Sequence, residues 1–317
     1  MERSHIRVPH AAPLSRAGKL SLLLGGAMLG PPTALLAAAR GVPGLRWHLH
    51  AYRVALRVAA RDPRALGRPL LQRLVLFPMD STRYFEFDCI GRWLASIRCE
   101  RYLDVSSPRL LPLVQLLLRP EIQADLLNPS AADLEETRYL LERLGVPGRW
   151  RLHDATIDAL PEGAGAFDVI TSVSVVEHIP QDAQAIQAMW HRLRPGGRLL
   201  ITVPCARTAS EQYIDRNYYG VLPTGEDEFF FWQRFYDEPL LRERFFPVTG
   251  PPARIAIYGE KVAGFLQRNM DRKRADAAYP LWREPLVMAN AFRYYDRIDD
   301  LPGEGVAALE FVKPAAR

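Results

Sequence analysis

The sequence has few cysteines, and the three that it has, Cys89, Cys99 and Cys205, are widely separated. No pair has the CxxC spacing of a zinc site, and an odd, scattered set does not suggest a disulfide framework. We therefore expect no structural disulfide and no metal centre. Free thiols of this kind fit a reducing compartment, so a cytoplasmic location is predicted.

The sequence also has only a small excess of positive charge. The 41 lysines and arginines are almost balanced by 36 aspartates and glutamates, which leaves a formal net charge of +5. Such a balance is weak evidence for nucleic-acid binding, and no nucleic-acid partner is expected. Basic residues are denser in the first 75 positions. They could face phosphates or anionic lipid, or they could form an ordinary solvated helix face.

Long uncharged runs are rare, and the segment Leu20–Ala39 stands out because it follows Arg16 and Lys19 and carries no charge. Pro31 and Pro32 lie in its middle and would break an isolated membrane-spanning helix. A membrane span or a cleaved signal remains an alternative. We favour a helical segment that is buried or that contacts a membrane surface.

The most informative stretch is 167–204, which reads as strand, loop, helix, turn and strand. Phe167–Ser172 is a short β-branched run of the kind that is buried on both faces of a sheet. A helical pattern of apolar residues follows, and Arg194–Gly197 ends it before an extended pattern resumes at Arg198–Val203. This order predicts one crossover unit of a parallel sheet.

The same alternation of strands and helices extends upstream from residue 102. We predict an α/β fold with a doubly wound, mostly parallel sheet. Residues 1–75, rich in helical spacings and prolines, are predicted to form an N-terminal helical extension, and residues 76–317 one elaborated domain. Further strands are expected at Tyr102–Val105, Ile122–Leu126, Trp150–Asp154, Arg254–Tyr258 and Val306–Val312.

Three segments carry a resemblance to a known family: Phe167-Asp168, Val176–Ile179 and Leu193–Leu199. In order and spacing they resemble class I S-adenosylmethionine-dependent methyltransferases, in particular the type 11 group. The resemblance implies a Rossmann-like methyltransferase fold and S-adenosyl-L-methionine as the cofactor. In such open sheets the ligand lies beyond the carboxyl ends of the strands.

The loop after the first strand departs from the family pattern of an acidic residue followed by glycines. Asp104 matches the acidic position, but Ser106 replaces the first glycine and Pro108 the second, with Ser107 between them. Proline removes one N–H donor, whereas a serine hydroxyl could bond to the ammonium or carboxylate of the ligand. Cofactor binding in a modified pose and loss of binding both remain open.

The resemblance assigns the other cofactor contacts. Asp125 is expected to accept hydrogen bonds from both ribose hydroxyls, although it could instead stabilise the start of the following helix. Asp154 is expected to receive the adenine amino group, and Ala155 to flank the base. Ser172 and Ser174 follow the next strand and are expected near the methionine end of the cofactor.

Glu177 and His178 are the predicted catalytic residues, since they lie one turn beyond that strand. An imidazole could take a proton from a hydroxyl or amine acceptor, and a carboxylate could orient it. A purely structural packing role for His178 is the alternative, and it is favoured over the catalytic role by about three to two.

An aromatic-rich insertion around residues 206–250 includes Tyr213, Tyr218, Tyr219 and Trp232. It is predicted to form a lid over a substrate, with a packed hairpin as the alternative. The resemblance to methyltransferases implies methylation of a small molecule, and the block Tyr213–Tyr236 resembles methyltransferase-like proteins of surface-polysaccharide clusters, which implies a saccharide intermediate as the acceptor. The alternative is a non-catalytic binding or assembly module, also at a membrane surface. Nothing in the sequence sets the oligomeric state.

Overall fold

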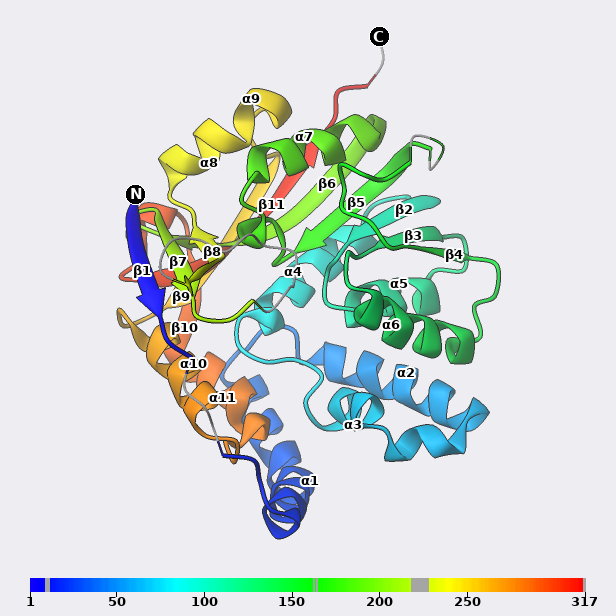
Figure 1. Ribbon diagram of the computed structural model, residues 1–317, viewed down its shortest axis with the longest axis vertical. Coiled ribbons are helices and arrows are strands. Elements are labelled where there is room, and N and C mark those ends of the chain that lie inside the picture. The colour runs from blue at the N-terminus through cyan, green and yellow to red at the C-terminus, as the bar shows by residue number, and fades with distance from the viewer. Residues whose placement is uncertain (9–11, 162, 164, 218–227, 316–317) are drawn as a thin grey trace.

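The computed structural model describes residues 1–8, 12–161, 163, 165–217 and 228–315. Its centre is an eight-stranded sheet with the strand order β10-β9-β11-β6-β5-β2-β3-β4 (Figure 1). The strands are β2 (Arg101–Val105), β3 (Gln123–Leu127), β4 (Trp150–His153), β5 (Phe167–Val173), β6 (Leu193–Ala206), β9 (Arg254–Glu260), β10 (Phe292–Tyr295) and β11 (Glu304–Val312).

The strands from β2 to β6 run parallel to one another, whereas β11, β9 and β10 continue the sheet in antiparallel fashion. The predicted Rossmann-like α/β fold with a mostly parallel sheet and N-terminal helices is confirmed. Six of the seven residues of β5 are buried, as a strand covered on both faces requires.

Helices cover both faces of the sheet. The helices are α1 (Arg16–Ala39), α2 (Arg46–Arg61), α3 (Pro69–Leu76), α4 (Arg83–Ala95), α5 (Leu110–Leu118), α6 (Ala131–Leu144), α7 (Asp182–Arg192), α8 (Glu238–Arg244), α9 (Phe246–Thr249), α10 (Phe265–Ala275) and α11 (Glu284–Ala291). One core cluster joins the sheet to α4, α5 and α6, with α2 and α3 packed outside them. A second cluster joins the opposite face to α7, α8 and α9.

The glycine turn predicted after α7 is a bulge within β6. Phe167 pairs with Leu193 and Val169 pairs with Arg198, so residues 194–197 are looped out of the register. Gly196 has a φ of +78°, and a Cβ added to Gly197 would lie 2.8 Å from the backbone oxygen of Arg194. Glycine is needed at both positions because one is left-handed and the other has no room for a side chain.

The N-terminal extension contains α1, α2 and α3, but it begins with a strand that the sequence pattern did not indicate. This strand, β1 (Glu2–Ile6), pairs in parallel with β7 (Ser210–Ile214), and β7 pairs with β8 (Phe230–Phe235). The three strands form a second, small sheet beside the large one (Figure 1). The predicted lid therefore includes the first residues of the chain. Tyr218 and Tyr219 lie outside the described residues.

Candidate active site

The carboxyl ends of β2 and β5 meet where the direction of winding changes. β2 pairs with β3 on one side and with β5 on the other, so the chain visits β3 and β4 before it returns to β5. In open α/β sheets, such a switch point is where ligands bind. Here the backbone N–H of Val173 donates a hydrogen bond of 3.0 Å to the Ser107 hydroxyl. This bond joins the loop after β2 to the last residue of β5, between Ser172, which lies inside β5 and not after it, and Ser174.

Ser106 has a left-handed backbone conformation. Its φ is +53°, in the left-handed region that glycine favours. Both its backbone N–H and its hydroxyl donate to the carbonyl oxygen of Leu127, over 2.8 and 3.1 Å. The hydroxyl is therefore used to join the loop to the end of β3.

Asp104 is buried and forms a hydrogen bond to the same loop. Its carboxylate accepts hydrogen bonds from the Tyr102 hydroxyl at 3.1 Å, the Thr171 hydroxyl at 2.7 Å and the Ser107 backbone N–H at 3.1 Å. Burial raises the pKa of Asp104 to about 6. In this arrangement Asp104 positions the loop and the junction of β2 with β5.

Asp125 lies inside β3 and is buried. One carboxylate oxygen is 3.1 Å from Nη2 of Arg101, and the other is 2.7 Å from Nε2 of His153. Both oxygens thus have partners within the sheet. Contact with the ribose hydroxyls stays a prediction for Asp125, and this geometry does not favour it.

Asn128, which the sequence interpretation passed over, is the residue that follows β3. Its side-chain oxygen accepts from the Ser130 backbone N–H at 2.9 Å, and its Nδ2 donates to Asp133 at 2.9 Å. It is half-buried at the edge where a ligand would lie. The end of the apolar run at Leu127, followed by a polar residue and Pro129, is the signal that would have identified Asn128.

Asp154 and Ala155 follow β4, the outer neighbour of β3. Asp154 is exposed, and Ala155 is half-buried against the second core cluster. They therefore lie at the same edge as Asn128, on the side away from β5. Their contact with adenine stays a prediction.

A buried carboxylate on α4 reaches the end of β5. Glu86 accepts hydrogen bonds from the Ser174 hydroxyl at 2.5 Å and the Thr202 hydroxyl at 2.7 Å. Its other oxygen lies 2.9 Å from Nη1 of Arg83. Neither Glu86 nor Arg83 was identified from the sequence, although a glutamate between Phe85 and Phe87 on a buried helix face was the available signal.

Ser174 links three elements at this point. Its φ of +51° is unusual for a residue with a side chain. Its backbone N–H donates to both the carbonyl and the hydroxyl of Thr202 on β6, while its own hydroxyl binds Glu86. Ser172, by contrast, is buried and its hydroxyl donates to the Val105 carbonyl at 3.4 Å. Of the two, Ser174 is the one that meets the carboxylate cluster.

Glu177 belongs to the short helix η3 (Val176–His178) and is buried. Burial, and secondarily the negative charge of Glu86, raises the pKa of Glu177 to about 8. Its Oε2 has no hydrogen-bond partner among the described residues. Glu177 is therefore largely protonated at neutral pH, which lowers the cost of burying it beside Glu86.

His178 contacts strand β8 of the small sheet. Its Nδ1 lies 2.5 Å from the carbonyl oxygen of Trp232, and the two rings pack with centroids 4.8 Å apart. Because a carbonyl can only accept, Nδ1 carries the proton and Nε2 is the basic nitrogen. Nε2 is 3.8 Å from Oε1 of Glu177. Burial lowers the pKa of His178 to about 4, so the ring is neutral at pH 7.

A pocket of about 290 Å³ lies beside the pair Arg83–Glu86, between α3, α4 and the start of α5. Arg83, Arg109 and the loop residue Pro108 contribute to its lining. Arg109 forms ion pairs of 2.5 Å with Asp133 and with Glu136 on α6, while its buried Nε has no hydrogen-bond partner among the described residues. The pocket thus presents guanidinium groups beside the loop that follows β2.

A family model described as "Methyltransferase domain" matches residues 113–244. The chain is 25% identical over 183 residues to dimethylglycine N-methyltransferase of Parasynechococcus marenigrum, covering 55% of this chain and 57% of that protein. It is 31% identical over 104 residues to the ubiquinone/menaquinone biosynthesis C-methyltransferase UbiE of Citrobacter koseri, covering 30% and 41%. This chain contains a class I S-adenosylmethionine-dependent methyltransferase domain.

The chain spans 57% and 41% of the lengths of these two relatives. The family match begins after the loop at 106–109, so that loop lies outside the matched part of the methyltransferase domain. Among solved structures, the chain is similar to coclaurine N-methyltransferase bound to N-methylheliamine and SAH. The TM-score is 0.48 at 10% identity, covering 95% of this chain and all of that one.

The residues at the switch point fit the amino-acid end of S-adenosylmethionine. Arg83, which pairs with Glu86, and Arg109, which pairs with Asp133 and Glu136, place guanidinium groups suited to a carboxylate in the lining of the pocket. At the nucleoside end, the half-buried Asn128 keeps one amide hydrogen and one oxygen lone pair for a hydroxyl group beyond its bonds to Asp133 and Ser130. The methyltransferase domain therefore has suitable groups for each end of the cofactor.

Proposed function

We propose that this protein transfers the methyl group of S-adenosylmethionine to a small-molecule acceptor. The observation that carries the proposal is the pair Glu177–His178, which lies at the end of β5 beside the switch point and under strand β8. When bound, the cofactor supplies an electrophilic methyl group on a sulfonium. The remaining chemistry is the placement of the acceptor and the removal of its proton.

His178 is the proposed general base. Its Nδ1 is fixed as a donor by the carbonyl of Trp232, which leaves Nε2 to accept a proton from a hydroxyl or amine. Glu177 lies 3.8 Å from that nitrogen. The proton of the acceptor passes to Nε2 as the acceptor atom bonds to the methyl carbon, and the Glu177 carboxyl keeps its own proton and presents an oxygen beside the imidazolium that forms. Because both groups are neutral at pH 7, the pair places no net charge in the buried site before reaction.

For the acceptor, we propose a small molecule bearing an amine or hydroxyl, with a saccharide intermediate as the narrower form of the idea. The names of the relatives describe methylation of dimethylglycine and steps of quinone biosynthesis, which are reactions of small molecules. The aromatic residues of the small sheet, among them Tyr213, Phe231 and Trp232, would suit stacking on a sugar or another flat apolar face. A cytoplasmic location stays a prediction.

The first experiment is calorimetric titration of the purified protein with S-adenosylmethionine and S-adenosylhomocysteine. Binding of both is expected, followed by methyl transfer when a panel of amines, phenols and sugars is screened by mass spectrometry. The variant His178→Gln should bind the cofactor as wild type does and lose transfer. Cofactor binding without transfer to any panel class would argue against the proposed acceptors, and loss of binding in His178→Gln would argue against its role as base.

A second function has one observation in its favour. The loop after β2 is closed by its own hydrogen bonds, since the Ser106 hydroxyl binds the Leu127 carbonyl and Pro108 lacks an N–H. A domain whose loop rejects the cofactor would act as a binding module. In that case wild type shows no heat of binding, and the double variant Ser106→Gly/Pro108→Gly gains affinity.

A further inference from the structure

Helix α1 has an apolar stripe that nothing in the described chain covers. Leu20, Leu24, Met28 and Leu35 are 57%, 55%, 74% and 73% exposed. Their spacing of four and seven residues puts them on one face of the helix. Gly26 and Ala37 are buried on the opposite face. Among the described residues, Arg16–Ala39 is the one helix long and apolar enough to cross a membrane.

The glycine face attaches α1 to the protein along its length. The helix packs against α11 and the short helix η5 (Leu281–Arg283). A Cβ built on Gly26 would lie 3.5 Å from Trp282, and Arg40 at the helix end donates 2.5 Å to the side chain of Asn290. Spanning a bilayer would require these contacts to break. The attached arrangement instead turns the leucine stripe outward while the helix lies along the surface of the protein.

The stretch of sequence that contains α1 carries charge of one sign. Between residues 3 and 61 the sequence has no aspartate or glutamate. Its nine cationic side chains are those of Arg3, Arg7, Arg16, Lys19, Arg40, Arg46, Arg53, Arg57 and Arg61. The chain as a whole has a formal net charge of +5, so the residues outside this segment carry a net charge of −4 and the segment holds all of the excess positive charge. Clustered cations beside an apolar helix are attracted to anionic lipid head groups.

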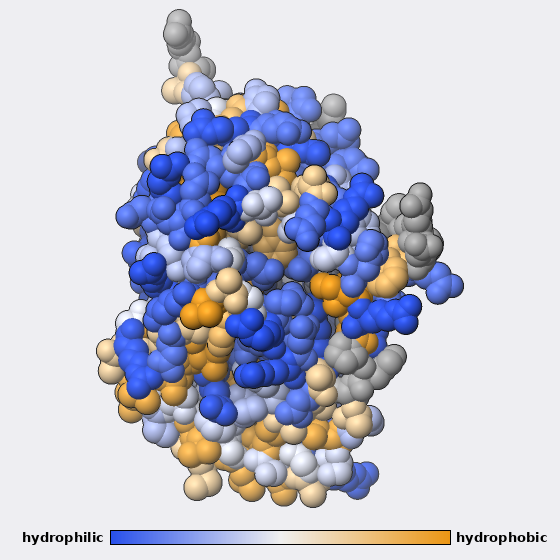
Figure 2. All heavy atoms as spheres, turned by 90° about the vertical axis from the view of Figure 1, so that its left-hand side faces the viewer, coloured by the Kyte–Doolittle hydropathy of each residue, from blue (hydrophilic) through white to orange (hydrophobic). Residues whose placement is uncertain are grey.

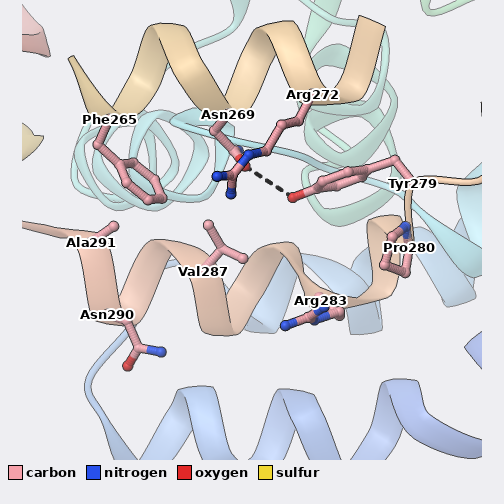
Figure 3. A pocket seen from close by; sticks show the side chains of 9 residues that line it. All are labelled: Phe265, Asn269, Arg272, Tyr279, Pro280, Arg283, Val287, Asn290 and Ala291. Atoms are coloured by element: carbon pink, nitrogen blue, oxygen red, sulfur yellow. Dashed lines mark hydrogen bonds between the residues drawn. The ribbon is translucent and has the colours of Figure 1, made fainter. Parts of the chain in front are cut away.

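A pocket lined by two arginines and several apolar side chains borders the same end of the molecule. It has a volume of about 260 Å³ and lies between α10 and α11, next to the helix to which α1 is attached (Figure 3). Arg272 and Arg283 line it, and no ion pair is found for either among the described residues. Phe265 and Val287 form its apolar wall. Guanidinium groups over an apolar wall suit a phosphate head group with an attached chain.

We propose that α1 docks this protein onto a membrane that contains anionic phospholipids. The helix lies in the interface, the stripe of Leu20, Leu24, Met28 and Leu35 enters the acyl boundary, and the flanking cations contact head groups. Figure 2 shows apolar atoms gathered at the lower end of the molecule, which is where Figure 1 places α1. This inference goes beyond the proposed function and does not depend on it.

The test is flotation of the full-length protein with vesicles of phosphatidylcholine alone or mixed with phosphatidylglycerol. We expect binding to the mixed vesicles to be at least about tenfold stronger and to weaken as salt is added. The triple variant Leu24→Gln/Met28→Gln/Leu35→Gln should lose binding while its thermal unfolding is unchanged. The matched control Leu118→Gln/Val262→Gln, at positions 46% and 64% exposed, should bind as wild type does.

Two further measurements test the alternatives to a membrane, which are free phosphate in the arginine pocket and a second copy of the chain on the leucine stripe. The variant Arg272→Gln/Arg283→Gln should lower vesicle binding several-fold, while inorganic phosphate should not bind measurably to the wild-type protein. Size-exclusion chromatography with light scattering should give the same mass for wild type and the triple variant. The proposal would be overturned if the protein did not bind vesicles or bound both vesicle types equally. It would also be overturned if the wild-type protein were a dimer and the triple variant a monomer, because the stripe would then be a dimer interface.

Discussion

The Nδ1 atom of His178 lies 2.5 Å from the backbone carbonyl of Trp232. This contact joins the end of β5 to the small sheet and sets which ring nitrogen carries the proton. Since the partner is a backbone atom, the tautomer depends on the position of β8 rather than on the identity of the side chain at 232. Movement of β8 would change both the cover over the site and the basicity of the histidine.

Replacing His178 should separate chemistry from cofactor binding. In His178→Gln, we expect the rate of methyl transfer to fall by about 10² to 10⁴, as for loss of a general base. The affinity for S-adenosylmethionine should change little. Single-turnover kinetics with saturating cofactor is the measurement. A rate within a few fold of wild type would leave His178 with a packing role.

Glu177 should make the protein less stable as the pH rises. Its pKa is about 8 in the folded protein and 4.5 in the reference state, so the folded state binds the proton more tightly. Stability from this group is fully present below pH 4.5 and is lost as the pH rises through 8. Relative to wild type, Glu177→Gln should gain about 1 to 3 kcal/mol at pH 9 compared with pH 5. Urea unfolding at the two pH values checks this, and a pH-independent difference would contradict it.

Substitution of Asn128 should affect cofactor binding, whereas substitution of Asp125 should affect the stability of the fold. Asn128→Ala should weaken cofactor binding by about 1 kcal/mol, with little effect on unfolding, if its amide bonds to the ligand. Asp125→Asn should instead destabilise the fold by about 2 to 4 kcal/mol, because Arg101 and His153 lose a buried charged partner. Calorimetry and denaturant unfolding on both variants decide between them. The opposite pattern would restore Asp125 as the ribose ligand.

Substitutions of Ser106 should reflect its left-handed backbone. Ser106→Gly removes a hydrogen bond to Leu127 but also relieves strain, so stability should stay within about 1 kcal/mol of wild type. Ser106→Val should cost about 2 kcal/mol or more, because a β-branched residue is strained at a φ of +53°. Thermal unfolding of the two variants provides the comparison, with Ser107→Ala as the neighbouring control. Equal stability of the glycine and valine variants would mean that the loop can adopt another conformation.

The sequence by itself determined the elements whose signals are local. β5, α7 and β6 follow from a β-branched run, an apolar pattern at helical spacing and a glycine turn, all within one stretch of chain. Local patterns of this kind set the secondary structure and show that strands alternate with helices along the chain, which is typical of a parallel sheet. They also put Ser106, Ser107 and Ser174 at strand ends, where the structure finds them.

Only the tertiary structure decided which side chains meet. Whether Asp125 or Asn128 faces the ligand edge depends on where β3 ends and on its register with β2 and β4, which a single sequence pattern does not fix. Glu86 meets Ser174 across 88 residues, and β1 pairs with β7 between Glu2 and Ser210. Such contacts arise because folding buries α4 against β6 and β11 and pairs the first residues of the chain with the small sheet. Their energies come from burial and partners that exist only once the chain is folded.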